Sequence, residues 1–277
     1  MKPVAFELCI SADIASAAGI LSQNDGDTKI IAGGQSLGPM LNLRLARPDR
    51  LVDVAQTPAL RKITQTQAFV AFGAATRHAE IEDGKTPDPS CGMMPYVASG
   101  IAYRAIRNKG TLGGSLCHAD PAADWVTAMT ALNATLIITS VGKDTRKTPM
   151  VEFMQGAYRT TLEPGEILTS VLVPKYSDKT VWGYYKICRK VGEFADAIVA
   201  WVADPTKQYS RIVLGAGSGA PLVLNHLAKE LAQTGNIPTL DIIKAELKLH
   251  SPDLDQVKNH LFAIALQRCV KGALANE

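Results

Sequence analysis

This 277-residue sequence has few cysteines, and their placement excludes several kinds of site. No two of them lie within four positions of each other, which excludes a local CxxC metal or iron–sulfur motif. Their odd number argues against a complete disulfide framework. We expect reduced thiols that mostly pack as small hydrophobic side chains. They are Cys9, Cys91, Cys117, Cys188 and Cys269.

Long apolar runs and runs of basic residues are also lacking. No stretch reaches the roughly 18–20 apolar residues of a membrane span, and the segment 1–10 lacks the apolar core of a signal peptide. The net charge is only +3, with no Lys/Arg run that would suit a nucleic-acid groove. Hydrophobic residues make up 47% of the chain, which is enough for a sizeable core. We therefore expect a globular, cytoplasmic protein.

The hydrophobic pattern predicts an α+β protein in two parts, with a boundary near Pro174–Lys179. In the first part, short strands mix with helices, and a polar turn is expected at 24–27. The predicted strands are Val4–Cys9, Lys29–Ala32, Leu51–Val54, Ala68–Phe72, Thr135–Ser140 and Ile167–Val173. The predicted helices are Ile14–Ser22 with Ser11 as cap, Thr76–Glu82 with Thr76 as cap, Pro95–Arg104, and Ala122–Leu132 started by Asp120.

The second part of the chain reads as three strands followed by three helices. Short turns join the strands, which favours an antiparallel sheet. The predicted strands are Val181–Arg189, Ala197–Ala203 and Ser210–Leu214. The predicted helices are Leu222–Gln233, Leu240–Leu249 and Leu254–Ala275, the last of them started by Ser251-Pro252-Asp253.

Two segments place adjacent glycines beside hydroxyl residues. The first glycine segment is Ala32–Ser36, and the second glycine segment is Thr111–Ser115. Glycine accepts positive φ and lets successive backbone N–H groups converge on a phosphate, to which serine and threonine hydroxyls add donors. Either segment taken alone is more often a tight turn. Two segments of the same chemistry indicate two phosphates, and hence a dinucleotide.

A third glycine cluster, Gly215–Ala220, fits the dinucleotide-binding spacing G-x-G-x-x-A. The corresponding Rossmann unit needs a strand–helix–strand order and an acidic residue about 20 positions further on. The acid at that distance, Asp241, begins a helix rather than ending a strand. The strands before the cluster look antiparallel, so a turn is the favoured interpretation.

His118, Asp120 and Asp124 admit two interpretations. A metal site needs three or four converging ligands, and no second histidine cluster lies nearby in the sequence. We therefore favour a helix start at Asp120, with His118 in the loop beside a ligand. Asp124 either holds a sugar or amide donor of that ligand or is a solvated acid in the first turn of the helix, and both remain open.

Two residues of the second part are less informative on their own. Lys186 alternates with apolar residues on a predicted strand, and a plain surface lysine is the commoner case. Phe194 is expected in the core unless a flat ligand lies against it. No nucleophile, base and orienting group occur together in the sequence. The chain therefore reads as a cofactor binder without a substrate-activating site of its own.

The two glycine segments with their flanks resemble the FAD-carrying medium subunit of molybdenum hydroxylases, the carbon monoxide dehydrogenase and xanthine dehydrogenase family. In 32–54, AGGQSL is followed by LRLARP and LVDV, and in 105–124, AIRNKGTLGGSL is followed by HADPAAD. The segments LEPGEIL (162–168) and RKVGEFA (189–195) fit as well. The match runs in order from about residue 4 to the C-terminus.

The resemblance implies an FAD-binding domain of the vanillyl-alcohol-oxidase (PCMH) type at 1–175. A C-terminal domain at 176–277, like that of carbon monoxide dehydrogenase flavoproteins, then carries the antiparallel sheet and three helices. Implied partners are a small subunit with two [2Fe–2S] clusters and a large subunit with a molybdenum–pterin cofactor, in a dimer of heterotrimers. Electrons would pass from the clusters through FAD to an external acceptor.

The resemblance also assigns residues of this chain to FAD. The two glycine segments hold the diphosphate, Asp124 bonds the cofactor, and Phe194 takes an aromatic position near the isoalloxazine, where tyrosine also occurs among relatives. The full set is Lys29, Ile30, Ile31, Ala32, Gly33, Gly34, Gln35, Ser36, Leu37, Ile101, Ala102, Ile106, Gly110, Thr111, Gly113, Gly114, Ser115, His118, Asp124, Leu168, Lys186 and Phe194.

Gln35 stands where some relatives have histidine, and glutamine cannot hold flavin covalently, so non-covalent FAD is expected. The cysteine-rich insertion that some relatives use for a [4Fe–4S] cluster is absent. Two alternatives remain. One is a self-sufficient flavin oxidase or reductase, which needs a catalytic base that the helical C-terminus does not offer. The other is a structural subunit without FAD, against which the intact glycine pairs argue.

Overall fold

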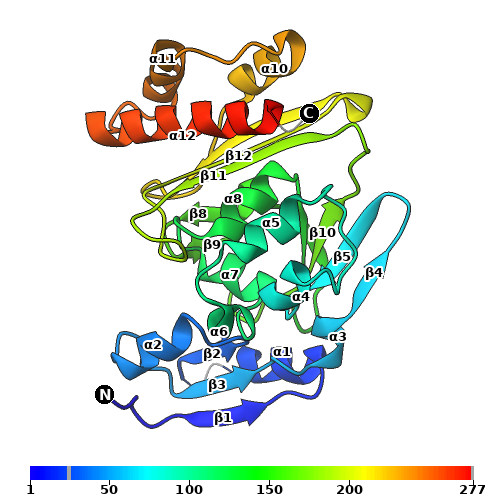
Figure 1. Cartoon of the computed structure of the whole chain (residues 1–277). Coiled ribbons are helices and arrows are strands. Elements are labelled where there is room, and N and C mark those ends of the chain that lie inside the picture. Colours follow the sequence, from blue (N-terminus) through cyan, green and yellow to red (C-terminus); the bar gives the residue numbers. More distant parts are fainter. Residues whose placement is uncertain (24–25, 276–277) are drawn as a thin grey trace.

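The chain folds into three layers stacked along one long axis, from the N-terminus at the bottom of Figure 1 to the C-terminus at the top. The computed structural model describes residues 1–23 and 26–275, so the turn expected at 24–27 lies partly outside the described residues. None of the helices in these two ranges is long and apolar enough to cross a membrane.

The first layer is a small parallel sheet in the order β1-β3-β2 with two helices. Its elements are β1 (Glu7–Ile10), α1 (Ile14–Ser22), β2 (Thr28–Ile31), α2 (Leu37–Asn42) and β3 (Arg50–Asp53). The cap of α1 is Asp13, whose carboxylate accepts from the Ser16 N–H at 2.7 Å. The predicted cap, Ser11, is wrong because Asp13 and Ser16 form a reciprocal capping box closer to the helix.

The middle layer contains an antiparallel sheet in the order β4-β5-β10-β6-β7, a short β8–β9 hairpin and seven helices in the described part of the chain. The strands are β4 (Ile63–Gln65), β5 (Phe69–Gly73), β6 (Thr135–Thr139), β7 (Arg146–Pro149), β8 (Met154–Gly156), β9 (Arg159–Thr160) and β10 (Ile167–Pro174). The helices are α3 (Pro58–Arg61), α4 (His78–Glu82), α5 (Met93–Ser99), α6 (Arg104–Arg107), α7 (Leu112–His118), α8 (Asp124–Ala131) and α9 (Met150–Phe153).

The third layer is an antiparallel sheet in the order β11-β12-β13-β14, covered on its outer face by three helices (Figure 1). Its strands are β11 (Val181–Ile187), β12 (Ala197–Asp204), β13 (Tyr209–Gly215) and β14 (Leu222–Val223). A short 3₁₀ turn, Pro205–Lys207, joins β12 to β13. The covering helices are α10 (Asn225–Thr234), α11 (Leu240–His250) and α12 (Gln256–Leu274).

Helix α8 and strand β12 join the middle and third layers. Every residue of α8 after Asp124 is buried, and so is every residue of β12. Because strand side chains alternate between faces, Ala200 and Val202 pack into the core around α8, while Val199 and Trp201 pack under the outer helices. The C-terminal sheet is therefore buried on both faces, and one continuous core runs through the middle layer into it.

The α+β class and the order of sheet and helices are confirmed, but several predicted helices differ in detail. The predicted helix Pro95–Arg104 is two helices, α5 and α6, separated by Ala102 in a left-handed conformation (φ 42°). Proline is the third residue of α5, a first-turn position whose N–H needs no helical partner. Leu222 begins a short strand that pairs with β13, so the predicted helix Leu222–Gln233 starts only at Asn225.

Three other predicted helix starts lie before the observed ones. Asp255 caps α12 by accepting from the Lys258 N–H at 2.8 Å, so the predicted start at 251–253 is too early. Arg77 rather than Thr76 is the first residue before α4, because the Thr76 hydroxyl donates to the Gly73 carbonyl instead. Asp120 accepts from the Ala122 N–H, which makes a turn, and α8 begins after it.

Candidate functional site

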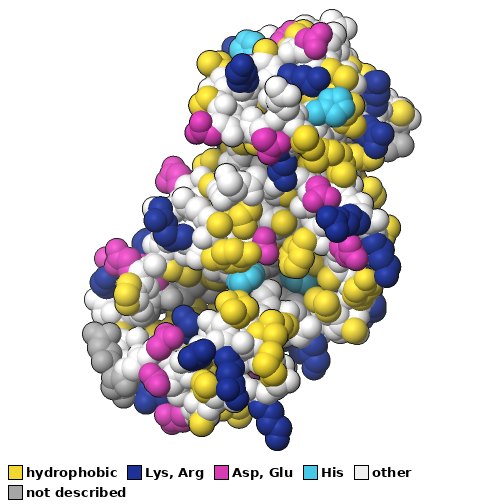
Figure 2. Space-filling model, turned by 90° about the vertical axis from the view of Figure 1, so that its left-hand side faces the viewer, with side chains coloured by type: hydrophobic (Ala, Val, Ile, Leu, Met, Phe, Trp, Pro, Cys, Tyr) yellow, Lys and Arg dark blue, Asp and Glu magenta, His cyan; other side chains and the backbone are white. Residues whose placement is uncertain are grey.

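A cleft of about 1120 Å³ lies between the first and middle layers. Figure 2 shows it as a hollow in the surface, with histidine side chains at its centre. Every residue that the sequence assigned to the cofactor lines this cleft, except Lys186. Residues from the two glycine segments, separated by about 75 positions in the chain, thus face a common space.

The first glycine segment leaves β2 and turns into α2. Within the described residues, the backbone N–H groups of Gly33, Gly34, Gln35 and Ser36 donate to no acceptor. Gly34 has φ +67°, a left-handed conformation that is natural for glycine. Successive unpaired N–H groups with such a residue among them form the kind of concavity that binds anions.

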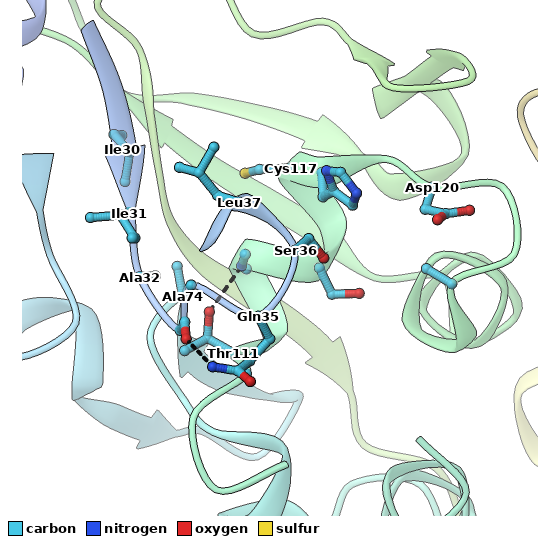
Figure 3. Close-up of a pocket in the computed structure, with 18 of the residues that line it drawn as sticks. Ile30, Ile31, Ala32, Gln35, Ser36, Leu37, Ala74, Thr111, Cys117 and Asp120 are labelled. Carbon is cyan, nitrogen blue, oxygen red and sulfur yellow. Dashed lines mark hydrogen bonds between the residues drawn. The ribbon is translucent and has the colours of Figure 1, made fainter. Parts of the chain in front are cut away.

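Side chains of the first glycine segment keep this concavity open. The Gln35 amide folds back and donates to the Gly33 carbonyl at 2.7 Å, as the dashed line in Figure 3 marks. Ser36 precedes α2 without making a capping bond, so its hydroxyl is free to donate. The segment therefore offers both backbone N–H donors and a hydroxyl donor. No side-chain acceptor of the segment binds these donors.

The second glycine segment is not a loop. Thr111 caps α7, its hydroxyl accepting from the Gly114 N–H at 3.1 Å, and the glycines form the first turn of that helix. The N–H of Leu112 donates to the Thr76 carbonyl at 2.9 Å, and that of Gly113 donates to the Ala74 carbonyl at 2.8 Å. The prediction of a second backbone cradle is therefore wrong, because these donors are already used inside the protein.

One glycine in each segment is needed for close packing. A Cβ added to Gly33 would lie 2.3 Å from the Lys109 carbonyl oxygen, and one added to Gly113 would lie 2.5 Å from the Ala74 Cβ. Gly33 thus lets the first segment touch the chain just before the second, while Gly113 lets α7 touch the end of β5. Figure 3 shows the first segment beside Thr111 at the start of α7.

Asp124 is the centre of a buried polar cluster at the start of α8. Its Oδ1 atom accepts from Lys186 Nζ at 2.9 Å and from the Tyr184 hydroxyl at 2.7 Å. Lys186 also donates to the Gly100 carbonyl at 2.9 Å. Burial, with the charge of Asp124 beside it, raises the pKa of Tyr184 well above its usual value, so its hydroxyl stays a donor.

The Asp124 cluster decides two questions that the sequence left open. Lys186 is not a surface lysine, since its side chain is only 12% exposed and ion-paired. Asp124 is not a solvated acid either, yet it lines the cleft, and its Oδ2 atom accepts no hydrogen bond from the described residues. The lysine thus fixes one carboxylate oxygen and leaves the other available to a ligand.

His118 and Asp120 lie near each other but do not form a metal site. Among residues 1–23 and 26–275, no group of three potential ligands comes together. The His118 ring packs against the Tyr158 ring at 5.2 Å between centroids, and the Tyr158 hydroxyl approaches Asp120 Oδ2 at 3.5 Å. Both residues form part of the cleft wall, but His118 ends α7 rather than lying in a loop, and Asp120 lies in the turn before α8 rather than starting it.

One end of the cleft is bordered by the chain between α5 and α6 and by the loop after β11. Arg107 donates to the carbonyls of Ile101 and Ala102, at 2.9 and 3.1 Å, which fixes the backbone there. Phe194, on the facing loop, is 72% exposed and lines the cleft, so of its two expected positions the core is excluded and a place beside a flat ligand is left. An exposed aromatic ring at a cleft edge leaves apolar surface for a flat ligand.

Several other wall residues are apolar. Leu168 is buried beneath the cleft, and Ile106 lines it from α6. Cys117, drawn in Figure 3, lines it from α7. Burial raises the pKa of the Cys117 thiol to about 12, so this cysteine acts as an apolar wall residue.

His78 is a cleft residue that the sequence did not reveal. It lies at the start of α4, is only 5% exposed, and accepts at Nδ1 from the Trp125 indole N–H at 2.9 Å. Burial, and secondarily the nearby Arg107 charge, lowers its pKa to about 4. Nothing in the flanking sequence distinguishes this histidine, because its partner Trp125 is 47 residues away.

The third glycine cluster, Gly215–Ala220, does not line the cleft. Gly215 ends β13, and a Cβ there would lie 1.8 Å from the Thr127 hydroxyl, so the glycine lets the strand approach α8. The chain then continues into the short strand β14. The favoured interpretation, a turn, is confirmed, and a Rossmann unit is excluded.

Comparison with known proteins identifies the family. The profile of the FAD binding domain in molybdopterin dehydrogenase matches residues 4–176. The chain belongs to this family. It is 36% identical over 225 residues to the 6-hydroxypseudooxynicotine dehydrogenase complex subunit alpha of Paenarthrobacter nicotinovorans, covering 79% of this chain and 76% of that one.

A second relative and a solved structure agree. The chain is 33% identical to the carbon monoxide dehydrogenase medium chain of Hydrogenophaga pseudoflava, covering 77% of this chain and 75% of that one. A solved structure, the reconstituted CO dehydrogenase from Oligotropha carboxidovorans, superposes with a TM-score of 0.89 at 29% identity and covers 100% of both chains. The chain is an FAD-binding medium subunit of the molybdenum hydroxylase family and an oxidoreductase component.

The residues of the cleft fit FAD. Unpaired N–H groups suit the two phosphates, the free Asp124 oxygen suits a hydroxyl or amide donor, and the apolar end near Phe194 suits a flat ring system. The cleft, at about 1120 Å³, is slightly larger than the roughly 300–1,000 Å³ of a typical small-molecule pocket, which suits a ligand as large as a dinucleotide. The structure therefore offers a donor, an acceptor and an apolar surface, which are the kinds of contact that a flavin dinucleotide requires.

Proposed function

We propose that this chain holds FAD non-covalently across the cleft as an electron relay. In this proposal, electrons arrive from two [2Fe–2S] clusters of a small subunit and leave to an external acceptor, within a dimer of heterotrimers whose large subunit carries molybdenum–pterin. The observation that carries it is the run of unpaired N–H groups at Gly33–Ser36. Within the described residues no acceptor of the chain uses that run, and such a run forms the kind of concavity that binds anions.

The proposal places the FAD diphosphate against the first glycine segment. The second segment contributes hydroxyls rather than backbone donors: Thr111 keeps its hydrogen while accepting from Gly114, and the Ser115 hydroxyl makes no hydrogen bond to the described chain. The two segments thus act on one anion from two sides, and their contact at Gly33 sets the spacing between them.

Asp124 would accept a hydrogen bond from FAD with its free Oδ2 atom. Lys186 and Tyr184 hold the other oxygen, so they position the carboxylate without touching the cofactor. A buried carboxylate with one fixed oxygen loses little side-chain entropy when a ligand binds. This arrangement supports a binding role for Asp124 and a positioning role for Lys186.

FAD supplies the redox chemistry when bound, and the chain binds it, orients it and keeps water from its buried parts. Gln35 contacts its own segment through an amide, which offers no nucleophile for a covalent link to flavin. In the same proposal, residues 1–175 form the FAD-binding domain and residues 176–277 form the C-terminal domain. The named relatives act on a nicotine derivative and on carbon monoxide, which agrees with a substrate site on another subunit.

The test is the visible spectrum of the chain purified alone and with its co-expressed neighbours. We expect flavin absorption in both samples and iron–sulfur bands only in the complex. Acid precipitation should release all the flavin, because the link is non-covalent. Turnover of a reducing substrate by the isolated chain would instead support a self-sufficient flavin enzyme, and a chain that refuses added FAD would support a structural subunit.

A further inference from the structure

His78 has one ring nitrogen whose use the fold does not explain. The Trp125 indole is a donor only, so its 2.9 Å bond to Nδ1 makes that atom the acceptor of the neutral ring. The proton of the neutral imidazole therefore resides on Nε2. The tautomer is thus set by a buried hydrogen bond between α4 and α8.

The Nε2–H group has no acceptor in the part of the chain that is described. Nor is it among the fully enclosed polar atoms without a partner, so it keeps access to the cleft that His78 lines. The His78 residue is only 5% exposed. Because this donor is open to the cleft and has no acceptor in the described chain, its partner comes from the contents of the cleft.

The neighbours of Nε2 locate that partner. A Cβ added to Gly110 would lie 2.7 Å from Nε2, so the glycine is what lets the ring reach the cleft here. The same Gly110 touches Gly33, whose added Cβ would lie 2.7 Å from the Gly110 Cα. In space, only Gly110 therefore separates the His78 ring from Gly33, where the run of unpaired N–H groups of the first glycine segment begins.

We propose that the Nε2–H of His78 donates a hydrogen bond to a diphosphate oxygen of bound FAD, as a neutral donor oriented by Trp125. This inference rests on the proposed function, since it assigns a further ligand to the same site. The ring is neutral there because burial disfavours its charged form, and the nearby Arg107 charge adds to that effect, so both lower its pKa.

Two variants separate the donor from its support. In His78→Asn the amide oxygen can still accept from Trp125, but the side chain is too short to place a donor at the Nε2 position. In His78→Gln the longer amide can reach that position. We expect FAD affinity to fall roughly 10- to 100-fold in His78→Asn, as for loss of a hydrogen bond to a charged group, and to recover partly in His78→Gln.

A measurement on the unaltered chain does not depend on variants folding. With ¹⁵N-histidine labelling of the full-length protein stripped of flavin, the His78 signals should report a protonated Nε2 and a bare Nδ1. Addition of FAD should shift the Nε2 proton downfield, and addition of riboflavin, which lacks the diphosphate, should not. An Nε2 proton equally shifted by riboflavin would overturn the assignment to the diphosphate.

The outcomes distinguish this inference from the proposed function. If the wild-type chain fails to bind FAD at all, the proposed function fails. If the wild type binds FAD and His78→Asn, folded by circular dichroism, binds it equally well, only the His78 assignment is overturned. If the variant binds weakly while its thermal unfolding without flavin matches that of the wild type, the lost donor rather than a disturbed core accounts for the effect.

Discussion

The two glycine segments share residue types and line one cleft, yet they do different physical work. In the first, the N–H groups of Gly33 to Ser36 find no acceptor in the described chain. In the second, Thr111 and neighbouring carbonyls already bind the N–H groups of Leu112, Gly113 and Gly114. Adjacent glycines therefore indicate that the backbone comes close to another group. The hydrogen bonds of their N–H groups show whether that group is a ligand or another part of the protein.

The largest expected effect comes from widening the contact between the segments. In Gly33→Val the side chain must displace the Lys109 carbonyl, 2.3 Å from the added Cβ, so the segments separate and FAD binding should be lost. In Gly113→Val the side chain meets Ala74 in the core, so folding itself should fail or the melting temperature should fall steeply.

Flavin content and thermal unfolding of both variants check this contrast. The matched control is Gly38→Ala, because Gly38 has open space within 4 Å of an added Cβ and no positive φ. It should keep both flavin and stability. Full flavin content in Gly33→Val would refute the contact, and a fully stable Gly113→Val would refute the packing role of α7.

The Asp124 cluster should give the next largest effect, this time on stability as well as binding. Asp124→Asn removes the counter-charge of Lys186, whose side chain is only 12% exposed, and breaking such a pair costs roughly 3 kcal/mol. Urea unfolding of the flavin-free protein measures this loss. FAD affinity should fall too, since the amide cannot replace the carboxylate as an acceptor of equal strength.

The double variant Asp124→Asn with Lys186→Met is the control for that cluster. It removes both charges, so the unfolding free energy should recover towards that of the wild type while FAD affinity stays low. Strictly additive losses would mean that the two groups do not interact as their 2.9 Å separation implies.

Gly34 tests backbone conformation without a clash. Its added Cβ would lie 3.4 Å from the nearest atom, in Ile31, so Gly34→Ala meets little steric resistance. Its φ of +67° costs alanine roughly 1 kcal/mol, and FAD affinity should therefore fall about 5-fold, measured by flavin fluorescence titration. An unchanged affinity with a lower unfolding free energy would mean that the left-handed conformation is present with and without FAD, so that its strain affects folding only.

The sequence predicted three antiparallel strands of the C-terminal sheet, most helices and the cleft-lining set, because those rest on periodicity and on segments that resemble relatives. It did not predict that 111–115 begins a helix, since glycine pairs have poor helical propensity and only tertiary bonds to Thr76 and Ala74 hold them there. It also missed His78, whose partner Trp125 is distant in sequence.

The burial of Lys186 was beyond the sequence for a similar reason. Alternation along β11 places Tyr184 and Lys186 on the same side of the strand, but it does not say what that side meets. Only the docking of the C-terminal sheet on α8 brings Asp124 to the lysine. Long-range contacts of this kind leave no local signal in a single sequence.

The smallest expected effects distinguish the capping role of Thr111 from the proposed FAD-binding role of Ser115 in the second segment. Thr111→Ala removes the acceptor for the Gly114 N–H and should cost about 1 kcal/mol of stability, whereas Thr111→Ser should cost far less. Ser115→Ala should leave stability unchanged, because its hydroxyl bonds to nothing in the described chain, and should weaken FAD binding a few-fold. Thermal unfolding without flavin and FAD titration together distinguish the two roles. A destabilised Ser115→Ala with normal affinity would reverse them, and would make the second segment wholly structural.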